Sequence, residues 1–392
     1  MLHKSDYSSE GVPVVNPANI VNGQISIDKI MYVKKEKSLE LSKYNLFLND
    51  ILLARRGDLS KCAIATSENI GWLCGTGSFV LHLCLIESYY FKLIYATQYI
   101  QSILATASVG ATMDNLNQDT FSKILIPIPP LEEQKRIING VHEWYNLIDS
   151  IDTNRKELSN AIEETKSRVL SLAISGKLVP QDPNDEPAID LLRRINPSFT
   201  PCDTSHYENL PQGWTVASVD QLCTVIGGLW TGKKPPFVNI GVIRNTNFTK
   251  DFKLDLANTA YLDVEAKQFA TRRLQQGDII LEKSGGSEKQ PVGRTILFDL
   301  KEGEYSFSNF TAVLRIKDKN ILLPKYLHFA LVNAYLNGAT RFMQKQTTGI
   351  HNLIMDKYVA LTIPIPPLAE QKRIVVAIEN VFQKLDKITA EL

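Results

Sequence analysis

Residues 126–137 read I-P-I-P-P-L-E-E-Q-K-R-I, and residues 363–374 read I-P-I-P-P-L-A-E-Q-K-R-I. The two copies differ at one position, where Glu132 stands in the first copy and Ala369 in the second. In each copy, prolines that cannot donate a backbone hydrogen bond precede a run with acidic residues first and basic residues after them. The pattern therefore predicts that each copy begins a helix.

Apolar residues recur at alternating steps of four and three after the first copy. This heptad spacing is typical of a helix that packs on another helix, and it predicts a helix over residues 131–175, about 65 Å long and ended by Gly176. The second copy offers the partner helix, and an ordinary amphipathic surface helix is the alternative. The predicted seam consists of Ile137, Val141, Trp144, Ile148, Ile151, Leu158 and Ile162 in the first helix and Ile374, Ile378, Val381 and Leu385 in the second.

Length and composition set wide limits. The chain of 392 residues, 44% of them hydrophobic, has room for two or three domains. No signal peptide opens the sequence and no uninterrupted apolar run of about 18 residues occurs, so we expect a cytoplasmic protein without a membrane span. The five cysteines form no C-x-x-C motif and no pattern with the six histidines, so we expect neither a metal site nor a disulfide framework. The formal charge of +1 gives no sign of a nucleic-acid partner, although residues 210–360 carry more basic than acidic side chains.

The repeat extends upstream of the proline motif. Residues 49–53 resemble residues 277–281, and residues 14–19 pair loosely with residues 242–247. A period as long as a domain indicates a tandem duplication and not a solenoid. We predict an α/β chain of two duplicated domains with pseudo-twofold symmetry, joined by long antiparallel coiled-coil helices. Its predicted segments are a first domain over residues 1–129, a helix over 130–178, a linker over 179–209 with a short helix near 188–195, a second domain over 210–366 and a second helix over 367–392.

The duplication is incomplete at two places. The second domain opens with L-P-Q-G-W at residues 210–214, and the first domain has no such opening. The second helix ends at Leu392, which matches Arg155 in the first helix. Either the sequence is a fragment, or another chain completes it.

These residues resemble the specificity (S) subunits of type I restriction-modification systems. The likeness is carried by the paired proline motif, by the run L-A-I-S-G-K-L-V-P-Q-D-P-N-D-E-P at residues 172–187 and by the opening at residues 210–214. It implies two target-recognition domains, each reading one half of a split double-stranded DNA site, with the coiled coil between them as a ruler.

The resemblance also implies partners. A specificity subunit is not itself an enzyme, and it would bind two modification (methyltransferase) subunits and, in some systems, restriction (endonuclease and translocase) subunits. S-adenosylmethionine, Mg and ATP would then be cofactors of those partners, and this chain would need none.

Catalytic motifs in the chain itself are weak. An adenine methyltransferase needs Asn or Asp before Pro-Pro-aromatic, whereas Lys234 stands before that triplet here. No glycine-rich strand-to-helix turn resembles a cofactor site. The E-x-K spacing of a nuclease occurs at Glu164 and Glu265, but three residues match by chance often. The open alternatives are a specificity subunit of another restriction system with a similar plan, and a coiled-coil scaffold that does not bind DNA.

Three kinds of polar stretch combine long donor side chains with flexible turns, as contact with DNA base edges requires. One follows the repeated apolar strand, one surrounds residues 231–234, and one precedes the second proline motif. A solvated loop charge is the alternative for any single residue, and for the set we predict DNA contact. The candidates are Arg55, Arg56 and Lys61 in the first domain and Thr231, Lys233, Lys234, Lys283, Lys289, Gln290, Arg294, Lys345, Gln346, Thr347 and Thr348 in the second.

Overall fold

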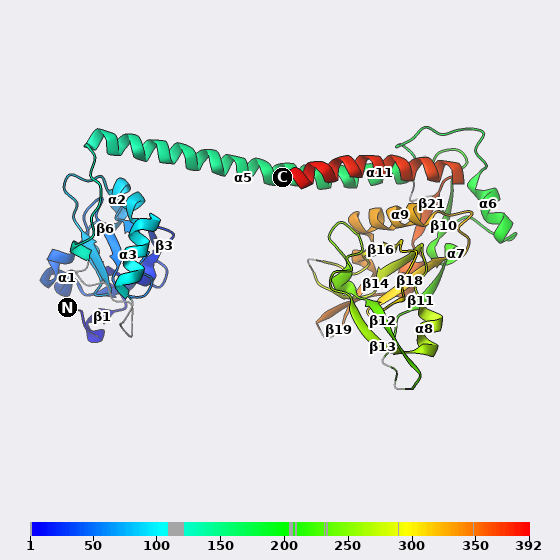
Figure 1. Ribbon diagram of the computed structural model, residues 1–392, viewed down its shortest axis with the longest axis horizontal. Helices are drawn as coiled ribbons and strands as arrows, with labels where there is room; N and C mark the ends of the chain where they lie inside the picture. Colours follow the sequence, from blue (N-terminus) through cyan, green and yellow to red (C-terminus); the bar gives the residue numbers. More distant parts are fainter. Residues whose placement is uncertain are drawn as a thin grey trace. The chain divides into compact units, whose positions relative to one another are not determined.

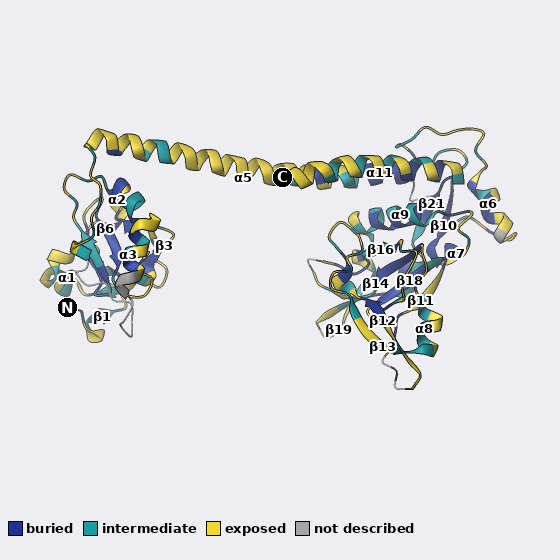
Figure 2. Ribbon diagram, viewed as in Figure 1, coloured by how far each residue is buried: buried dark blue, intermediate teal, exposed yellow. Residues whose placement is uncertain are grey.

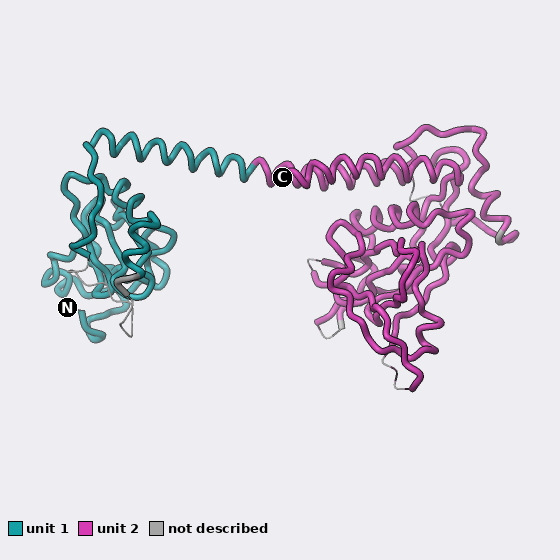
Figure 3. The backbone as a smooth tube through the Cα atoms, viewed as in Figure 1, with its two compact units in different colours: residues 1–153 teal, residues 154–392 magenta. Residues whose placement is uncertain are grey.

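The computed structural model of the protein describes residues 2–108, 121–203, 207, 210–230, 232, 234–288, 290–347 and 349–392; of residues 106–108, 195 and 347 it describes the backbone alone. The chain divides into two compact units, Met1–Thr153 and Asn154–Leu392 (Figure 3). The division falls inside one long helix, and each unit has its own hydrophobic clusters. No helix among the described residues is both long enough and apolar enough to span a membrane.

The long helix is α5 (Leu131–Ile174), and its bounds confirm the helix predicted over residues 131–175 (Figure 1). Gly176 follows it with a φ of 71°, and the N–H of Lys177 donates to the carbonyl of Leu172 at 2.8 Å. A Cβ on Gly176 would lie 2.3 Å from Cγ of Pro211. Glycine is therefore required at this helix end by its positive φ and by the close approach of Pro211.

Helix α11 (Leu368–Glu391) supplies the predicted antiparallel partner within unit 2 (Figure 1). Nζ of Lys166 in α5 lies 2.8 Å from Oδ1 of Asp386 in α11, and the buried Ile374 and Ile378 share one cluster with the end of α5. The predicted seam is nevertheless only half formed. Ile162 is buried, and Val141, Val381 and Leu385 are half-buried, whereas the exposed members are Ile137, Trp144, Ile148, Ile151 and Leu158.

Unit 1 is built on two small sheets. One has the strand order β1 (Tyr7–Ser8), β5 (Met31–Val33), β2 (Val12–Val15) and β8 (Leu73–Cys74), and the other has the order β7 (Cys62–Ile64), β6 (Ile51–Ala54) and β9 (Ser78–Leu81). A further hairpin joins β3 (Ile20–Val21) to β4 (Gln24–Ile25). The helices are α1 (Lys35–Glu40), α2 (Ser88–Tyr95), α3 (Gln98–Ser108) and the first half of α5.

Unit 2 repeats this plan with more strands. Its main sheet has the order β11 (Cys223–Gly227), β18 (Thr311–Ile316), β14 (Asp278–Glu282) and β16 (Thr295–Phe298). A second sheet has the order β13 (Ala260–Glu265), β12 (Phe237–Ile243) and β17 (Tyr305–Phe307). Strand β10 (Thr215–Ser218) pairs with β21 (Thr362–Ile365). The helices besides α5 and α11 are α6 (Ala188–Ile195), α7 (Val219–Leu222), α8 (Ala266–Arg272), α9 (Pro324–Leu336) and α10 (Met355–Val359). Helix α6 has the bounds expected for the short helix in the linker.

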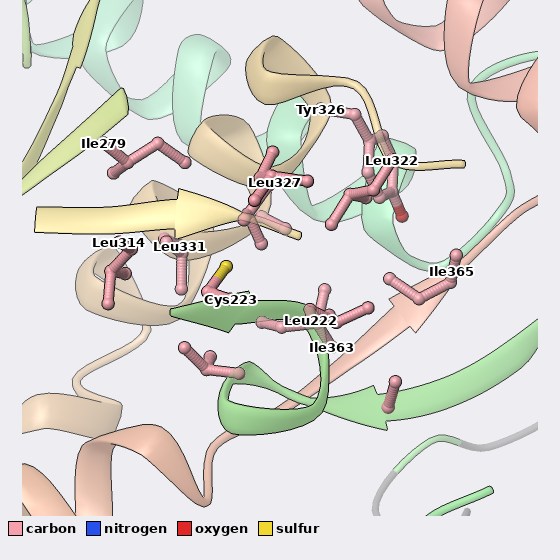
Figure 4. Close-up of a cluster of buried hydrophobic side chains, with 14 of the residues drawn as sticks. Leu222, Cys223, Ile279, Leu314, Leu322, Tyr326, Leu327, Leu331, Ile363 and Ile365 are labelled. Carbon is pink, nitrogen blue, oxygen red and sulfur yellow. The ribbon is translucent and has the colours of Figure 1, made fainter. Parts of the chain in front are cut away.

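The core of unit 2 lies between α9 and the main sheet. Leu327 and Leu331 of α9 face Ile279 and Leu314 of the sheet, and Ile363 from β21 extends the same cluster (Figure 4). All five side chains are buried. The second proline motif is therefore anchored in the main core before it enters α11.

Strand pairing confirms the predicted duplication. Strand β6 pairs antiparallel with β7 and β9, as β14 does with β16 and β18. Strand β2 lies parallel to β8, as β12 does to β17. The turn after each parallel pair is closed by a buried asparagine, because Asn19 accepts the N–H of Asn16 at 3.1 Å and Asn247 accepts that of Arg244 at 2.9 Å.

Each proline motif is held to its unit by a buried glutamine. We call residues 124–137 the first junction and residues 361–374 the second junction. In the first, Nε2 of Gln134 donates to the carbonyls of Pro129 and Leu85 at 2.9 and 3.1 Å, and its Oε1 accepts the N–H of Glu87 at 2.8 Å. Gln371 makes the same three bonds in the second junction, to Pro366, Ile321 and Leu323. The tyrosine bond to the second motif residue is also repeated, from Tyr90 to Pro127 and from Tyr326 to Pro364.

Candidate nucleic-acid interface

Two of the three predicted polar stretches of unit 2 meet in one small sheet. Strand β20 (Ile350–Leu353) lies between β15 (Ser284–Gly286) and β19 (Gln344–Thr347) and is antiparallel to both. Asn352 is opposite Ser284 on one side and Lys345 on the other. The side chains of Lys345 and Gln346 are exposed. Residues far apart in the sequence therefore form one polar surface, which we call the tip sheet.

The strand that follows the apolar core strand β14 is tied firmly to its surroundings. The N–H groups of Lys283 and Ser284 donate to the carbonyl of Phe310 at 2.9 and 3.0 Å, and the carbonyl of Lys283 accepts the N–H of Leu353 at 2.8 Å. Oγ of Ser284 lies 2.6 Å from Oδ1 of Asn352. The Lys283 side chain is half-buried. These bonds fix the backbone from which the Lys283 side chain extends.

Arg294 of the predicted set forms a buried ion pair. Its Nε and Nη2 donate to the two carboxylate oxygens of Glu282 at 2.8 and 2.9 Å, with 12% and 3% of the two side chains exposed. The carboxylate raises the pKa of this guanidinium against the opposing effect of burial. This buried bidentate ion pair engages two of the guanidinium nitrogens within unit 2, and DNA contact by Arg294 stays a prediction. The exposed Gln290 lies beside it, where its amide oxygen can accept from Arg294.

The third polar stretch of unit 2 borders a groove beside the tip sheet. The groove is lined by Trp230, Gly232, Arg244, Asn245 and Phe310, among others. Trp230 is 67% exposed and Phe310 is 43% exposed. Nδ2 of Asn245 donates to the carbonyl of Ser284 at 2.5 Å, which joins this groove to the tip sheet. An aromatic ring and a cation that line the same groove can take up a planar, electron-rich group.

The exposed Lys234 lies beside the groove and is fixed through its backbone. Its N–H donates to Oε1 of Glu265 at 2.6 Å, and its side chain is free to extend into solvent. Of the other predicted contacts, Thr231, Lys233, Lys289 and Thr348 lie outside the described residues, and Thr347 is described only by its backbone in β19.

Unit 1 presents the corresponding turn after β6. Arg56 is exposed, and Gly57 beside it has a φ of 73°. Arg55 is half-buried, with its guanidinium carbon 5.3 Å from the Phe79 ring centroid, so it stacks as a cation on an aromatic face. Nζ of Lys61 donates to the carbonyl of Pro17 at 3.2 Å. Of the three candidates in unit 1, Arg56 is therefore the most available for contact.

Sequence reasoning missed several residues of this surface. Trp230 and Phe310 are not among the predicted contacts, although both are exposed beside the groove. Arg244, Asn245 and Asn352 were not chosen, although Arg244 and Asn245 stand in the repeated segment that follows the parallel strand. The repeat of residues 14–19 at residues 242–247 was the signal in the sequence that could have identified Arg244 and Asn245. A turn that occurs in both copies with different polar residues is a candidate for DNA recognition.

Three of the five free cysteines, Cys62, Cys74 and Cys223, are buried. Burial raises the pKa of the Cys62, Cys74 and Cys223 thiols to about 12, so these groups are protonated and unreactive near neutral pH. Among the residues that the structure describes, no three His, Cys, Asp or Glu side chains come together in a way that could hold a metal ion.

Comparison with known proteins agrees with this geometry. The type I restriction enzyme EcoKI specificity subunit from Escherichia coli K12 is 22% identical over 394 residues, which are 99% of this chain and 78% of that protein. The StySPI specificity subunit from Salmonella potsdam is 22% identical over 386 residues, which are 97% and 77% of the two chains.

Solved structures share the fold. The HsdS subunit from Thermoanaerobacter tengcongensis has a TM-score of 0.58 at 18% identity, with 97% of this chain and 85% of that chain covered. A chain from a study of complex assembly and conformational transition in the type I R-M system has a TM-score of 0.62, also at 18% identity, with 97% and 86% covered.

The family described as Type I restriction modification DNA specificity domain matches residues 1–163 and again residues 211–392. The two matches coincide with the two copies of the strand plan. The chain therefore belongs to the type I restriction-modification DNA specificity family and is a DNA-recognition subunit of such a system.

Proposed function

We propose that each unit reads one half of a bipartite double-stranded DNA site. The observation that carries this proposal is that two copies of one strand framework end in different polar turns. After β6 the turn presents Arg55 and Arg56, and after β14 it presents Lys283 and Ser284. A common scaffold with different donors at the same place suits two readers of different sequences.

The proposed contacts in unit 2 are Lys283, Lys345, Gln346 and Lys234, with Gln290, Asn352 and the Trp230 groove beside them. Lysines neutralise phosphates, whereas glutamine and asparagine amides can pair with base edges. In unit 1 we propose Arg55 and Arg56, with Lys61 contributing charge nearby. The recognition domains would span residues 1–129 and 210–366, with helices over 130–178 and 367–392 as a ruler between half-sites and residues 179–209 as the linker.

The proposed partners are modification subunits, two of them because the chain holds two copies of one plan, and restriction subunits where the system has them. The relatives support this, since they are named as specificity subunits of type I restriction enzymes. We propose that the chain itself is not an enzyme and works in the cytoplasm. S-adenosylmethionine, Mg and ATP would then bind to the partner subunits.

A domain exchange tests the two-reader proposal. Residues 210–366 would be replaced by the equivalent domain of a relative, and the exchanged chain would be expressed with its modification subunits. Mapping of methylated sites should show one half-site changed and the other retained. A change in both halves would show that the units do not read independently, and methyl transfer by the purified chain alone would refute a non-enzymatic role.

A point substitution tests the tip sheet. Lys345→Ala should weaken binding of the assembled complex to its site and lower the slope of log affinity against log salt by about 1, because one phosphate contact is lost. Lys177→Ala, just beyond α5, is the matched control and should leave the slope unchanged. An equal slope for Lys345→Ala and the unsubstituted chain would remove Lys345 from the interface.

A further inference from the structure

Each unit has a cavity beside the same turn of its framework, residues 75–77 in unit 1 and residues 308–310 in unit 2. The first N–H of each turn donates at 2.9 Å to the carbonyl of Val15 or Ile243, the last residues of β2 and β12. The last carbonyl of each turn accepts, also at 2.9 Å, the N–H of the residue that follows β6 or β14. Both of these strands are buried along their whole length (Figure 2). The two turns are therefore equivalent, and each is held against the core of its unit.

The cavity in unit 1, which we call the Ser78 pocket, has a volume of about 600 Å³. Arg55, Thr76, Ser78 and Phe79 are among the residues that line it. The guanidinium carbon of Arg55 lies 5.3 Å from the centroid of the Phe79 ring, so a cation and an aromatic ring line the pocket together. A pocket of this size has room for a planar organic group such as a DNA base.

The cavity in unit 2 is the Trp230 groove, whose volume is about 480 Å³. Ser308 and Asn309 of the equivalent turn line it, together with the exposed Trp230 and Arg244. This groove also combines an aromatic ring with a guanidinium group, but the residues that supply them stand at other places in the framework. Arg244 follows β12, whereas the arginine of the Ser78 pocket follows β6. The shared framework alone therefore does not account for the shared chemistry.

Each cavity is lined by a serine whose hydroxyl lacks a partner. Ser78 is 8% exposed, and among the described residues neither its Oγ nor Nε of Arg55 has a hydrogen-bond partner, although both atoms are buried. In the described part of unit 2 the same holds for Oγ of Ser308 and for Oδ1 of Asn245, whose Nδ2 already donates to the carbonyl of Ser284. Buried polar atoms normally have partners, and an unmatched one costs free energy. Two such pairs beside equivalent cavities indicate a ligand that supplies the missing bonds.

The recessed position of these polar atoms limits what the ligand can be. The chain is a DNA-recognition subunit, and bases of an intact duplex are read by side chains that project into a groove of the DNA. A buried atom beside a cavity does not reach such a base. A base that has left the stack can enter the cavity, lie against the aromatic ring and bond to the unpaired polar atoms. A serine hydroxyl needs rotation about only one bond to meet it.

We propose that the Ser78 pocket and the Trp230 groove each hold one base of the bound DNA that has turned out of the duplex. This inference rests on the proposed reading of one half-site by each unit. In the Ser78 pocket, Nε of Arg55 donates to a ring nitrogen or carbonyl of the base, and the Ser78 hydroxyl makes a second bond. In the Trp230 groove, Oδ1 of Asn245 accepts an N–H of the base, and the indole ring stacks on its face.

Removal of a serine hydroxyl tests the proposal in each unit. The full chain would be assembled with its modification subunits on the duplex site that methylation mapping identifies. Ser78→Ala and Ser308→Ala should each weaken binding about five-fold, because one hydrogen bond to the base is lost. Neither substitution should lower the stability of the free chain, since neither hydroxyl has a partner there among the described residues. A loss of stability would show that the hydroxyl is bonded within the fold and would overturn its assignment to a base.

Thr295→Val is the matched control for loss of an unpaired hydroxyl. Oγ1 of Thr295 is buried in β16 without a partner among the described residues, and Thr295 lines neither cavity. This variant should bind the site as tightly as the unsubstituted chain. Weakening equal to that of the serine variants would assign their effect to the fold and would overturn the proposal.

DNA that lacks single bases should locate the two positions. Each nucleotide of a half-site would be replaced in turn by an abasic one. At one position in the half-site of unit 1, Ser78→Ala should no longer weaken binding, because the base that it contacts is gone. Trp230→Ala should find the position in the other half-site, and Trp230→Phe should keep most of the affinity, because it retains a ring on which the base stacks. Aminopurine, a fluorescent adenine analogue, placed beside either position should gain fluorescence on binding, because its stacking neighbour leaves the duplex.

The outcomes separate this proposal from the one on which it rests. Failure of the unsubstituted complex to prefer its mapped site over unrelated duplex would refute the reading of half-sites itself. Specific binding that both serine substitutions leave unchanged would show that water fills the cavities, and it would overturn the base-holding proposal alone. A position that coincides with the methylated base would overturn it too, because a methyltransferase takes up that base in its own active site.

Discussion

The two units keep the same main-chain pairings but stabilise them with different buried side chains. The last residue of β14 is Glu282, which pairs with Arg294, and the last residue of β6 is the buried Ala54. At the start of these strands, Asp278 in β14 pairs with Arg315 at 2.7 Å, whereas Asp50, just before β6, lies 2.7 Å from Nδ1 of His82. The strand plan thus tolerates either charged or apolar residues at these positions.

The difference separates two contributions to the fold. Strand pairing and the asparagine and glutamine bonds recur in both copies, so they specify the framework. The arginine–carboxylate pairs occur in unit 2 at places where unit 1 has alanine or histidine, so they stabilise one copy without defining the plan. Unit 2 should consequently be the more sensitive of the two to loss of a single charge.

The largest effect is expected from Arg294→Met. It leaves the Glu282 carboxylate buried without its guanidinium, which should destabilise unit 2 by about 4 kcal/mol. Amide exchange in β14 would report this loss while exchange in β6 stays unchanged. His82→Gln is the matched change in unit 1, and because half of the His82 side chain is exposed it should cost below about 1 kcal/mol. Similar losses in the two units would contradict the distinction.

A smaller and more informative difference is expected at the two glutamines. Gln371→Ala leaves two carbonyls and one N–H without partners in the second junction, whose proline motif is buried, and should destabilise unit 2 by about 3 kcal/mol. Gln134→Ala removes the same bonds beside an exposed motif, so hydration should limit the loss to about 1 kcal/mol. Hydrogen exchange of the β21 amides would measure the loss of stability in Gln371→Ala, and exchange of the amides of residues 124–130 would measure the loss in Gln134→Ala. Equal losses of stability in the two variants would show that burial of the second proline motif does not strengthen the glutamine bonds of the second junction.

The smallest effect concerns acid. His328 in α9 is buried with Nε2 3.2 Å from the carbonyl of Thr295, and burial lowers its pKa from 6.5 to about 4. Between these values the unfolded chain takes up the proton and the folded unit does not, so stability falls as pH drops from 6.5 toward 4, by up to about 1.4 kcal/mol per pH unit. Unit 2 should therefore lose stability at pH 5, and His328→Gln should flatten its pH profile. An unchanged slope in that variant would assign the acid sensitivity to other groups.

Much of the framework could be predicted because its signals are local. Prolines before an acidic-then-basic run start a helix wherever they occur, and Gly176 ends one because of its backbone, so α5 was located within a residue. The duplication was visible because two motifs and two strand turns recur in the same order. None of these inferences needed knowledge of distant contacts.

The parts that escaped prediction depend on pairing between distant residues. The ion pair of Arg294 with Glu282 is revealed only by the folded main sheet. Asn352 meets Ser284 only when β20 inserts between β15 and β19. The heptad pattern likewise shows which residues can form a helix–helix seam. It does not show how many of them are buried against α11.

The tip sheet also bears on how such a protein changes through evolution. Lys345 and Gln346 are exposed on β19, while the bonds that hold the sheet run through the backbone and through Asn352. Substitutions at these two positions touch no buried side chain, so they should be nearly neutral for folding. New variants can therefore accumulate at these two exposed positions without compensating mutations elsewhere, while the inherited scaffold stays intact.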